Sequence, residues 1–161
     1  MSDASRQTLG KGGRTVSILN SDALQEKFPG SVFHPEQRLI TWFPQGVLTN
    51  DRADELVEFL ELAEKHEGKP FNRYTDMSGY TQIDIGLDHI IRLARRRRKD
   101  YRGAPVRSAF YAVRLLSVGI ARMYEELMCG SKIQVCTFRD RSEAASWLGV
   151  PGEILVPPKS K

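Results

Sequence analysis

The 161-residue sequence lacks several features that would place a protein in a specialised class. Cysteine occurs only twice, as Cys129 and Cys136, which is too few for the disulfide framework of a small secreted domain. No apolar run approaches the ~18 residues that a membrane-spanning helix needs. The first residues are polar and lack the apolar core of a signal peptide. We therefore expect a cytoplasmic protein with reduced thiols and no transmembrane segment.

Residues that commonly carry catalysis are also scarce. The three histidines, His34, His66 and His89, are scattered, and neither cysteine lies at a metal-ligand spacing from them. Ser117 precedes a glycine by two positions but lacks the Gly-x-Ser-x-Gly pattern of a hydrolase nucleophile. The sequence therefore indicates neither an enzyme nor a metal site, and we expect no cofactor.

The overall composition is that of an ordinary single-domain protein. Hydrophobic residues make up 40% and charged residues 27%, and the net charge of +4 permits an acidic partner without requiring one. Residues 1–14 are polar and glycine-rich, which predicts a flexible tail. Residues 150–161 contain three prolines and predict an extended C-terminal tail. The domain itself should span residues 15–149.

Predicted strands and helices alternate along this domain. Residues 31–49 favour a β-hairpin with a turn at Pro35–Gln37, and Asn50 can cap a helix that Gly68 and Pro70 end. Further strands are predicted at residues 71–77, 106–113 and 132–138, and further helices from Asp84, Ser117 and Ser142. Because parallel strands need helical crossovers, this order predicts an α/β fold with a mixed sheet.

The stretch from Arg73 to Leu87 is the first place where we expect function. Asp76, Ser78, Thr81 and Asp84 fall where a central strand should give way to a helix, and sites gather at the carboxyl ends of strands in open α/β sheets. These residues could form a partner-binding or phosphoacceptor patch. The alternative is turn chemistry, in which Asp and Ser bond the local backbone and Thr81 or Asp84 caps the helix. Nothing beside the carboxylates indicates acid–base catalysis.

A basic run follows on the next predicted helix and is a second candidate surface. Its cations include Arg92, Arg95, Arg96, Arg97, Arg98 and Lys99. Consecutive helical residues point in different directions, so these side chains cannot all face one partner. The run could be a solvated helix end paired with the acidic helix at residues 51–65 of the same or a neighbouring chain. It could also contact a protein, an anionic membrane or a nucleic acid, although no nucleic-acid-binding module accompanies it.

Three stretches carry a resemblance to a known family. They are residues 39–49 (LITWFPQGVLT), 117–127 (SVGIARMYEEL) and 135–149 (VCTFRDRSEAASWLG). With the order of elements, these stretches resemble the STAS-like fold of bacterial anti-anti-sigma factors, in particular the sporulation stage II AA-like (SpoIIAA-like), or STAS/SEC14-like, family. The resemblance covers roughly residues 31–149. It implies a mixed sheet of about four to six strands with helices packed mainly on one face.

The resemblance also implies a regulatory role. In regulatory members a serine follows an aspartate at the start of the helix after the central strand, and a partner kinase phosphorylates it. Asp84 matches the aspartate, but Ile85 and Gly86 follow it, so the phosphoacceptor serine is absent. Ser78 and Thr81 are nearby hydroxyls that could take a phosphate.

The preferred hypothesis is therefore a non-enzymatic regulatory or protein-interaction module, acting on a kinase-like or sigma-regulatory partner or by dimerisation. Its working surface would be residues 78–87, with Ser117 nearby. One alternative is a SEC14-like carrier with a groove between the sheet and the second and third helices, which could accept a hydrophobic or anionic ligand. Another is an anionic-surface or nucleic-acid binder that uses residues 92–102.

Overall fold

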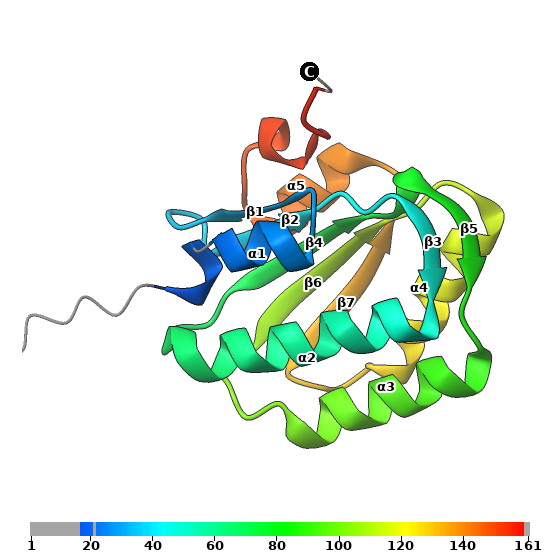
Figure 1. Ribbon diagram of the computed structural model, residues 1–161. Coiled ribbons are helices and arrows are strands. Elements are labelled where there is room, and N and C mark those ends of the chain that lie inside the picture. Colours follow the sequence, from blue (N-terminus) through cyan, green and yellow to red (C-terminus); the bar gives the residue numbers. More distant parts are fainter. Residues whose placement is uncertain (1–16, 21, 160–161) are drawn as a thin grey trace, which may run out of the picture.

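The computed structural model describes residues 17–20 and 22–159 (Figure 1). The predicted flexible tail at residues 1–14 lies outside these residues. The first half contains η1 (Ile18–Asn20), α1 (Asp22–Lys27), β1 (Ser31–His34), β2 (Leu39–Trp42), β3 (Gly46–Thr49), α2 (Asn50–Glu67), β4 (Asn72–Asp76) and η2 (Met77–Gly79). The second half contains β5 (Tyr80–Asp84), α3 (Leu87–Asp100), β6 (Val106–Tyr111), α4 (Leu115–Leu127), β7 (Ile133–Phe138), α5 (Arg141–Leu148) and η3 (Gly152–Leu155).

A five-stranded mixed sheet in the order β1-β2-β4-β6-β7 forms the centre of the molecule. The β1–β2 pair is antiparallel, and the three other pairs are parallel. A second sheet consists of the short parallel pair β3–β5. The α/β fold predicted from the alternation of elements is therefore confirmed. The five strands of the main sheet fall within the predicted range of about four to six.

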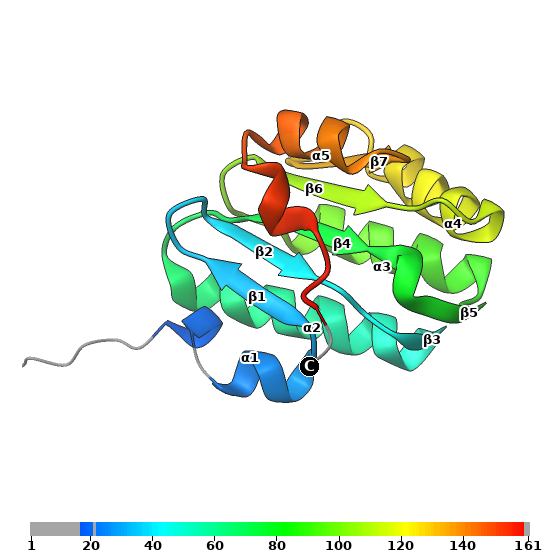
Figure 2. The same ribbon diagram turned by 90° about the horizontal axis from the view of Figure 1, so that it is seen from above.

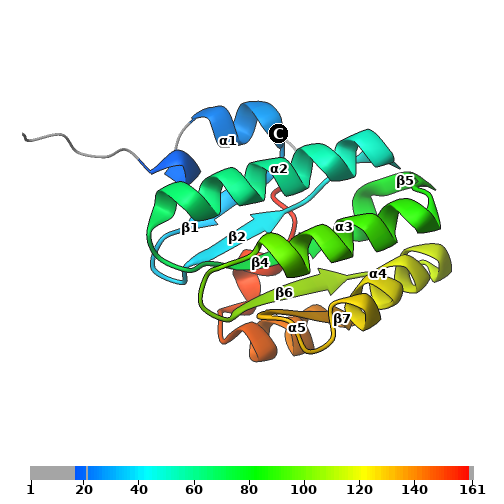
Figure 3. The same cartoon turned by 90° about the horizontal axis from the view of Figure 1, so that it is seen from below.

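Helices cover the two faces of the main sheet unequally. The longer helices α2, α3 and α4 lie over one face (Figure 3), whereas α5 and η3 lie over the other (Figure 2). Side chains alternate along a strand, so each strand contributes to both layers. On β4, Tyr74 packs with the α5 layer and Thr75 faces the α2–α4 layer.

The local sequence explains the positions of the first hairpin and of α2. β1 and β2 form the predicted hairpin, with Ser31 opposite Trp42 and His34 opposite Leu39. The N-cap of α2 is Thr49, one residue before the predicted cap, and its hydroxyl accepts a hydrogen bond from the Arg52 amide at 3.2 Å. The helix ends where Gly68 adopts the left-handed conformation with φ 66°.

The predicted helix start at Asp84 is wrong, because residues 80–84 form β5. Ile83 pairs opposite Leu48 of β3 and packs against the same apolar cluster, which favours a strand at this position. Helix α3 begins only at Leu87, after an extended Gly86. The turn and helix predicted for residues 78–87 are thus a short 3-10 turn, a strand and a helix start.

Two further helix starts and the C-terminal tail also differ from the predictions. Helix α4 begins before Ser117, and α5 is capped by Asp140, whose carboxylate accepts from the Ser142 amide at 2.7 Å. The predicted extended tail from residue 150 instead contains η3, whose Leu155 is fully buried in the α5 layer. A proline-rich segment favours an extended chain. Here the burial of one leucine and the partial burial of two neighbouring apolar residues favour the 3-10 turn instead.

Candidate functional site

Asp76 ends β4 and is the centre of the predicted patch. Its side chain is only 1% exposed. One carboxylate oxygen accepts from the Ser78 amide at 2.9 Å and from the Ser78 hydroxyl at 2.5 Å. The other accepts from Nε and Nη2 of Arg141 at 3.2 and 2.8 Å, and the Arg141 guanidinium lies 4.1 Å from the centroid of the Tyr111 ring. Both oxygens are therefore engaged within the fold.

The other members of the predicted patch do not join Asp76 and Ser78. The Thr81 hydroxyl donates to the Gly46 carbonyl at 3.2 Å, which ties β5 to β3. Asp84 is exposed at the end of β5. Ser117 is buried in the first turn of α4. Of the five predicted residues, the structure thus brings only Asp76 and Ser78 together. Their contact is the turn chemistry that the sequence offered as an alternative.

The basic run on α3 is not one continuous surface. Arg97 is 2% exposed, so its prediction as a surface residue is wrong. Arg98 donates to the carbonyls of Leu127 and Cys129 at 3.2 and 2.7 Å, which ties α3 to the end of α4. Exposed side chains in the run include Arg92, Arg95 and Lys99, which share one face of α3 because they are spaced three and four residues apart.

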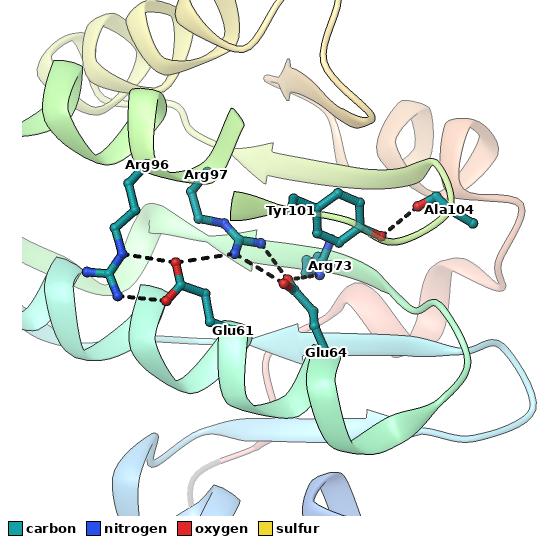
Figure 4. Close-up of polar contacts among 7 residues, drawn as sticks. All are labelled: Glu61, Glu64, Arg73, Arg96, Arg97, Tyr101 and Ala104. Carbon is teal, nitrogen blue, oxygen red and sulfur yellow. Dashed lines mark hydrogen bonds and ion pairs between the residues drawn. The ribbon is translucent and has the colours of Figure 1, made fainter. Parts of the chain in front are cut away.

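The buried part of this run belongs to an ion-pair network between α2, α3 and β4 (Figure 4). Arg96 binds Glu61 through two hydrogen bonds of 3.0 and 2.6 Å. Arg97 lies 3.9 Å from Glu61 and donates to both oxygens of Glu64. Arg73, from the central strand β4, donates to the same Glu64 carboxylate through Nη2. Arg96 and Arg97 of the basic run thus pair with the acidic helix of the same chain, one of the alternatives that the sequence left open.

Burial shapes the electrostatics of this network. Desolvation lowers the pKa of Arg73 to about 10, and the nearby Glu64 carboxylate opposes that change only in part. The Arg73 guanidinium also lies 4.6 Å from the centroid of the Phe71 ring, a cation–π distance. Arg73 is therefore a buried cation at the edge of an apolar layer, an environment that is costly unless the charge is balanced.

A cavity of about 150 Å³, partly open to solvent, lies between the sheet and the helices α2, α3 and α4. Its walls are predominantly apolar and come from strands and helices alike. They include Trp42, Val57, Met77, Leu93, Phe110 and Ala121. Arg73 and Arg97 also contribute to the lining, so the ion-pair network borders the apolar space. Apolar cavities with a few convergent polar groups are typical ligand sites.

Sequence reasoning placed a groove between the sheet and the helices but missed the residues that give it polarity. The sequence pattern does not identify Arg73, Glu61 and Glu64 as a buried polar group. One signal was available. Arg73 shares a strand face with Phe71 and Thr75 in a central strand, and a cation at such a position needs a buried partner.

Comparisons with known proteins found similarity at the level of structure. No protein-family model matches the chain, and no curated protein matches it. The structure is similar to that of an uncharacterised protein from the DUF3478 family with a SpoIIAA-like fold, from Shewanella loihica PV-4. The two share 18% identity with a TM-score of 0.45, over 68% of this chain and 83% of the other. That neighbour has the fold that the sequence resemblance predicted.

Within residues 17–20 and 22–159, no helix combines the length and the apolar character needed to cross a membrane.

Proposed function

We propose that this protein is a non-enzymatic module that binds a small, mainly apolar molecule in the cavity between the sheet and α2–α4. The observation that supports this function is the apolar cavity itself, lined by a sheet and three helices. Close-packed interiors contain few voids larger than a water molecule, so a space of about 150 Å³ is a large departure from normal packing.

The size and polarity of the cavity define the ligand class. Apolar cavities of about this volume stay dry and accept a benzene-sized molecule. Filling such a space restores dispersion contacts that the lining residues lack, which stabilises the folded protein. A ligand with roughly six to eight non-hydrogen atoms in its apolar part suits the volume.

Toluene tests this function because it is apolar and uncharged. We expect saturating toluene to raise the melting temperature and to shift the amide resonances of residues around the cavity, such as Val57, Leu93 and Ala121. Ala121→Leu should fill the cavity and abolish both effects. Ala23→Leu adds the same side chain at an exposed position of α1 and should leave both effects intact. Absence of toluene-dependent shifts in the wild-type protein would overturn the proposal.

A second candidate function is contact with a protein partner, as the family resemblance implies. Leu115 is 87% exposed at the start of α4, and the adjacent Leu116 and the first residue of α3, Leu87, are also exposed. The starts of α3 and α4 lie at the same end of the molecule (Figure 3). Large exposed apolar side chains gathered in one region are typical of interaction sites.

The partner-contact function is tested by substituting these leucines. We expect Leu115→Ser with Leu116→Ser to abolish a complex that the wild-type protein forms, either with itself in sedimentation velocity or with a cross-linked partner. Leu62→Ser changes an exposed leucine in the middle of α2 and should leave the complex unchanged. Equal complex formation by all three proteins would refute a contact at this end.

A further inference from the structure

Three buried N–H-bearing nitrogens on the sheet side of the cavity lack a hydrogen-bond acceptor among the described residues. They are Nε1 of Trp42 and Nε and Nη1 of Arg73. Both side chains belong to the cavity lining. Trp42 is on β2 and Arg73 is on the adjacent β4, where Ile40 pairs opposite Arg73 and Trp42 pairs opposite Thr75. The unpaired donors therefore come from neighbouring positions of one sheet face.

Unpaired buried donors are rare and need an explanation. A buried N–H without an acceptor costs about 1–3 kcal/mol, and more when the group is charged. Arg73 is 6% exposed. Its Nη2 donates to Glu64 and its guanidinium lies 5.8 Å from the centroid of the Tyr101 ring, yet Nε and Nη1 have no acceptor among the described residues. Glu64 is shared with Arg97, so its carboxylate serves two cations. The packing leaves Arg73 with donors that a ligand could use.

The charge of the network points to the same need. Arg96 forms a bidentate pair with Glu61 and is also close to the carboxylates of Glu58 and Asp100, so its charge is balanced. The two buried guanidinium groups, those of Arg73 and Arg97, share the Glu64 carboxylate, and Arg97 lies 3.9 Å from Glu61. A single negative charge beside Arg73 would balance the buried group.

We infer that the ligand of the cavity is a small organic monoanion, with an apolar body among the side chains of α2–α4 and a carboxylate-type head group that accepts from Arg73. This inference rests on the proposed apolar-binding function and adds the class of ligand. Hydrogen bonds from a guanidinium to a carboxylate are shorter and stronger than those between neutral groups. Trp42 is placed to donate a further hydrogen bond from the same wall.

The inference is tested with three probes that share the same apolar benzyl body. Toluene carries no polar group, phenylacetamide carries a neutral acceptor, and phenylacetate carries the same apolar ring with a carboxylate. Binding is measured at pH 7 by calorimetry and by amide chemical shifts. We expect phenylacetate to bind the wild-type protein at least tenfold more tightly than phenylacetamide.

Two variants assign that preference to Arg73. Arg73→Met retains the length of the side chain without the charge, and the preference for phenylacetate should fall below twofold. Arg73→Lys retains the charge and provides a second variant if the methionine variant does not fold; it should keep a reduced preference of a few fold. Arg95→Met removes an exposed cation from α3 and should leave the tenfold ratio unchanged.

The outcomes separate this inference from the proposed function. If toluene binds and phenylacetate binds no better than phenylacetamide, the anion inference is wrong while the apolar site stands. If none of the three probes binds, the proposed function itself fails. A tenfold preference that persists in both Arg73 variants would place the head group elsewhere and overturn the assignment.

Discussion

Two charged residues on β4 show how the environment of a side chain decides its role. Asp76 and Arg73 are both buried in the same five-residue strand. Asp76 has both carboxylate oxygens engaged, by Ser78 and by Arg141. Arg73 has only Nη2 engaged by a described residue. The fully paired residue therefore serves the fold, and the partly paired residue is the better candidate for ligand contact.

Removal of the Asp76 carboxylate should be costly. Asp76→Ala leaves the Ser78 amide and the Arg141 guanidinium without their acceptor, and we expect a loss of roughly 2–3 kcal/mol in the free energy of unfolding. This loss is smaller than that expected for a fully buried ion pair, because Arg141 is about a third exposed. Urea denaturation monitored by circular dichroism measures the change.

The control for this prediction is Asp76→Asn, which keeps an acceptor for Ser78 and removes only the charge. We expect its loss to be about half that of the alanine variant. If the free energy of unfolding of the alanine variant lies within about 0.5 kcal/mol of the wild-type value, the hydrogen bonds around Asp76 do not contribute to stability in the way we infer.

At the scale of elements, the start of α3 differs from the switch helix that the resemblance implies. The N-cap position is Gly86, which has no side chain to accept from the first amides of the helix. Its backbone is extended with φ −74°, and an added Cβ would meet nothing within 4 Å. A side chain is therefore tolerated there without strain.

Gly86→Ser should stabilise the protein. The serine hydroxyl can cap α3, and the substitution also lowers the conformational entropy of the unfolded chain, so we expect a gain of about 0.5–1 kcal/mol. The matched control is Gly149→Ser, at a position with φ 70°, where a side chain is strained and the same change should destabilise. Thermal denaturation of both variants provides the comparison, and a gain at Gly149 would contradict the backbone argument.

Some elements could be predicted from the sequence and others could not. The β1–β2 hairpin and α2 follow from local alternation, turn residues and an apolar stripe, all of which act over a few residues. β5 depends on β3, which is more than thirty residues away, and its sequence from Tyr80 to Asp84 has no clear period. The distant pairing of Ile83 with Leu48 therefore decided the structure of that segment.

The same distinction holds for the candidate site. The layer that contains the cavity was predictable, because a sheet with helices on one face must enclose an apolar interior. The partners of Arg73 were not predictable from the sequence, because Glu64 reaches Arg73 only when α2 packs on the sheet. The role of Arg97 also depended on which side of α3 meets α2, and that is a property of the assembled fold.

At the scale of the whole molecule, buried tyrosines make the free energy of unfolding depend on pH in the alkaline range. Burial raises the pKa of Tyr74, Tyr80, Tyr101 and Tyr124 above the ordinary value near 10. Between pH 10 and the raised values the unfolded chain releases protons that the folded protein keeps, so stability falls as the pH rises. Arg73 acts in the opposite direction, because its pKa of about 10 lies below that of the unfolded chain.

Four tyrosines outweigh one arginine, so we expect the free energy of unfolding to be lower at pH 11 than at pH 9. Urea titrations at the two pH values measure the difference. Tyr80→Phe removes one titrating phenol from the apolar cluster beside α2 and should reduce the difference. Equal stability of the wild-type protein at both pH values would contradict the burial of these hydroxyls in the folded state.

The alternation of charges along β4 also has a consequence for how the sheet assembles. Arg73 meets Glu64 on the α2–α4 face, and Asp76 meets Arg141 on the α5 face. A slip of one residue in strand pairing would exchange the two faces, so Arg73 would lose Glu64 and Asp76 would lose Arg141. Each buried charge would then lack its partner, which is costly. The two charges of the central strand thus favour a single register of the sheet once α2 and α5 pack on it.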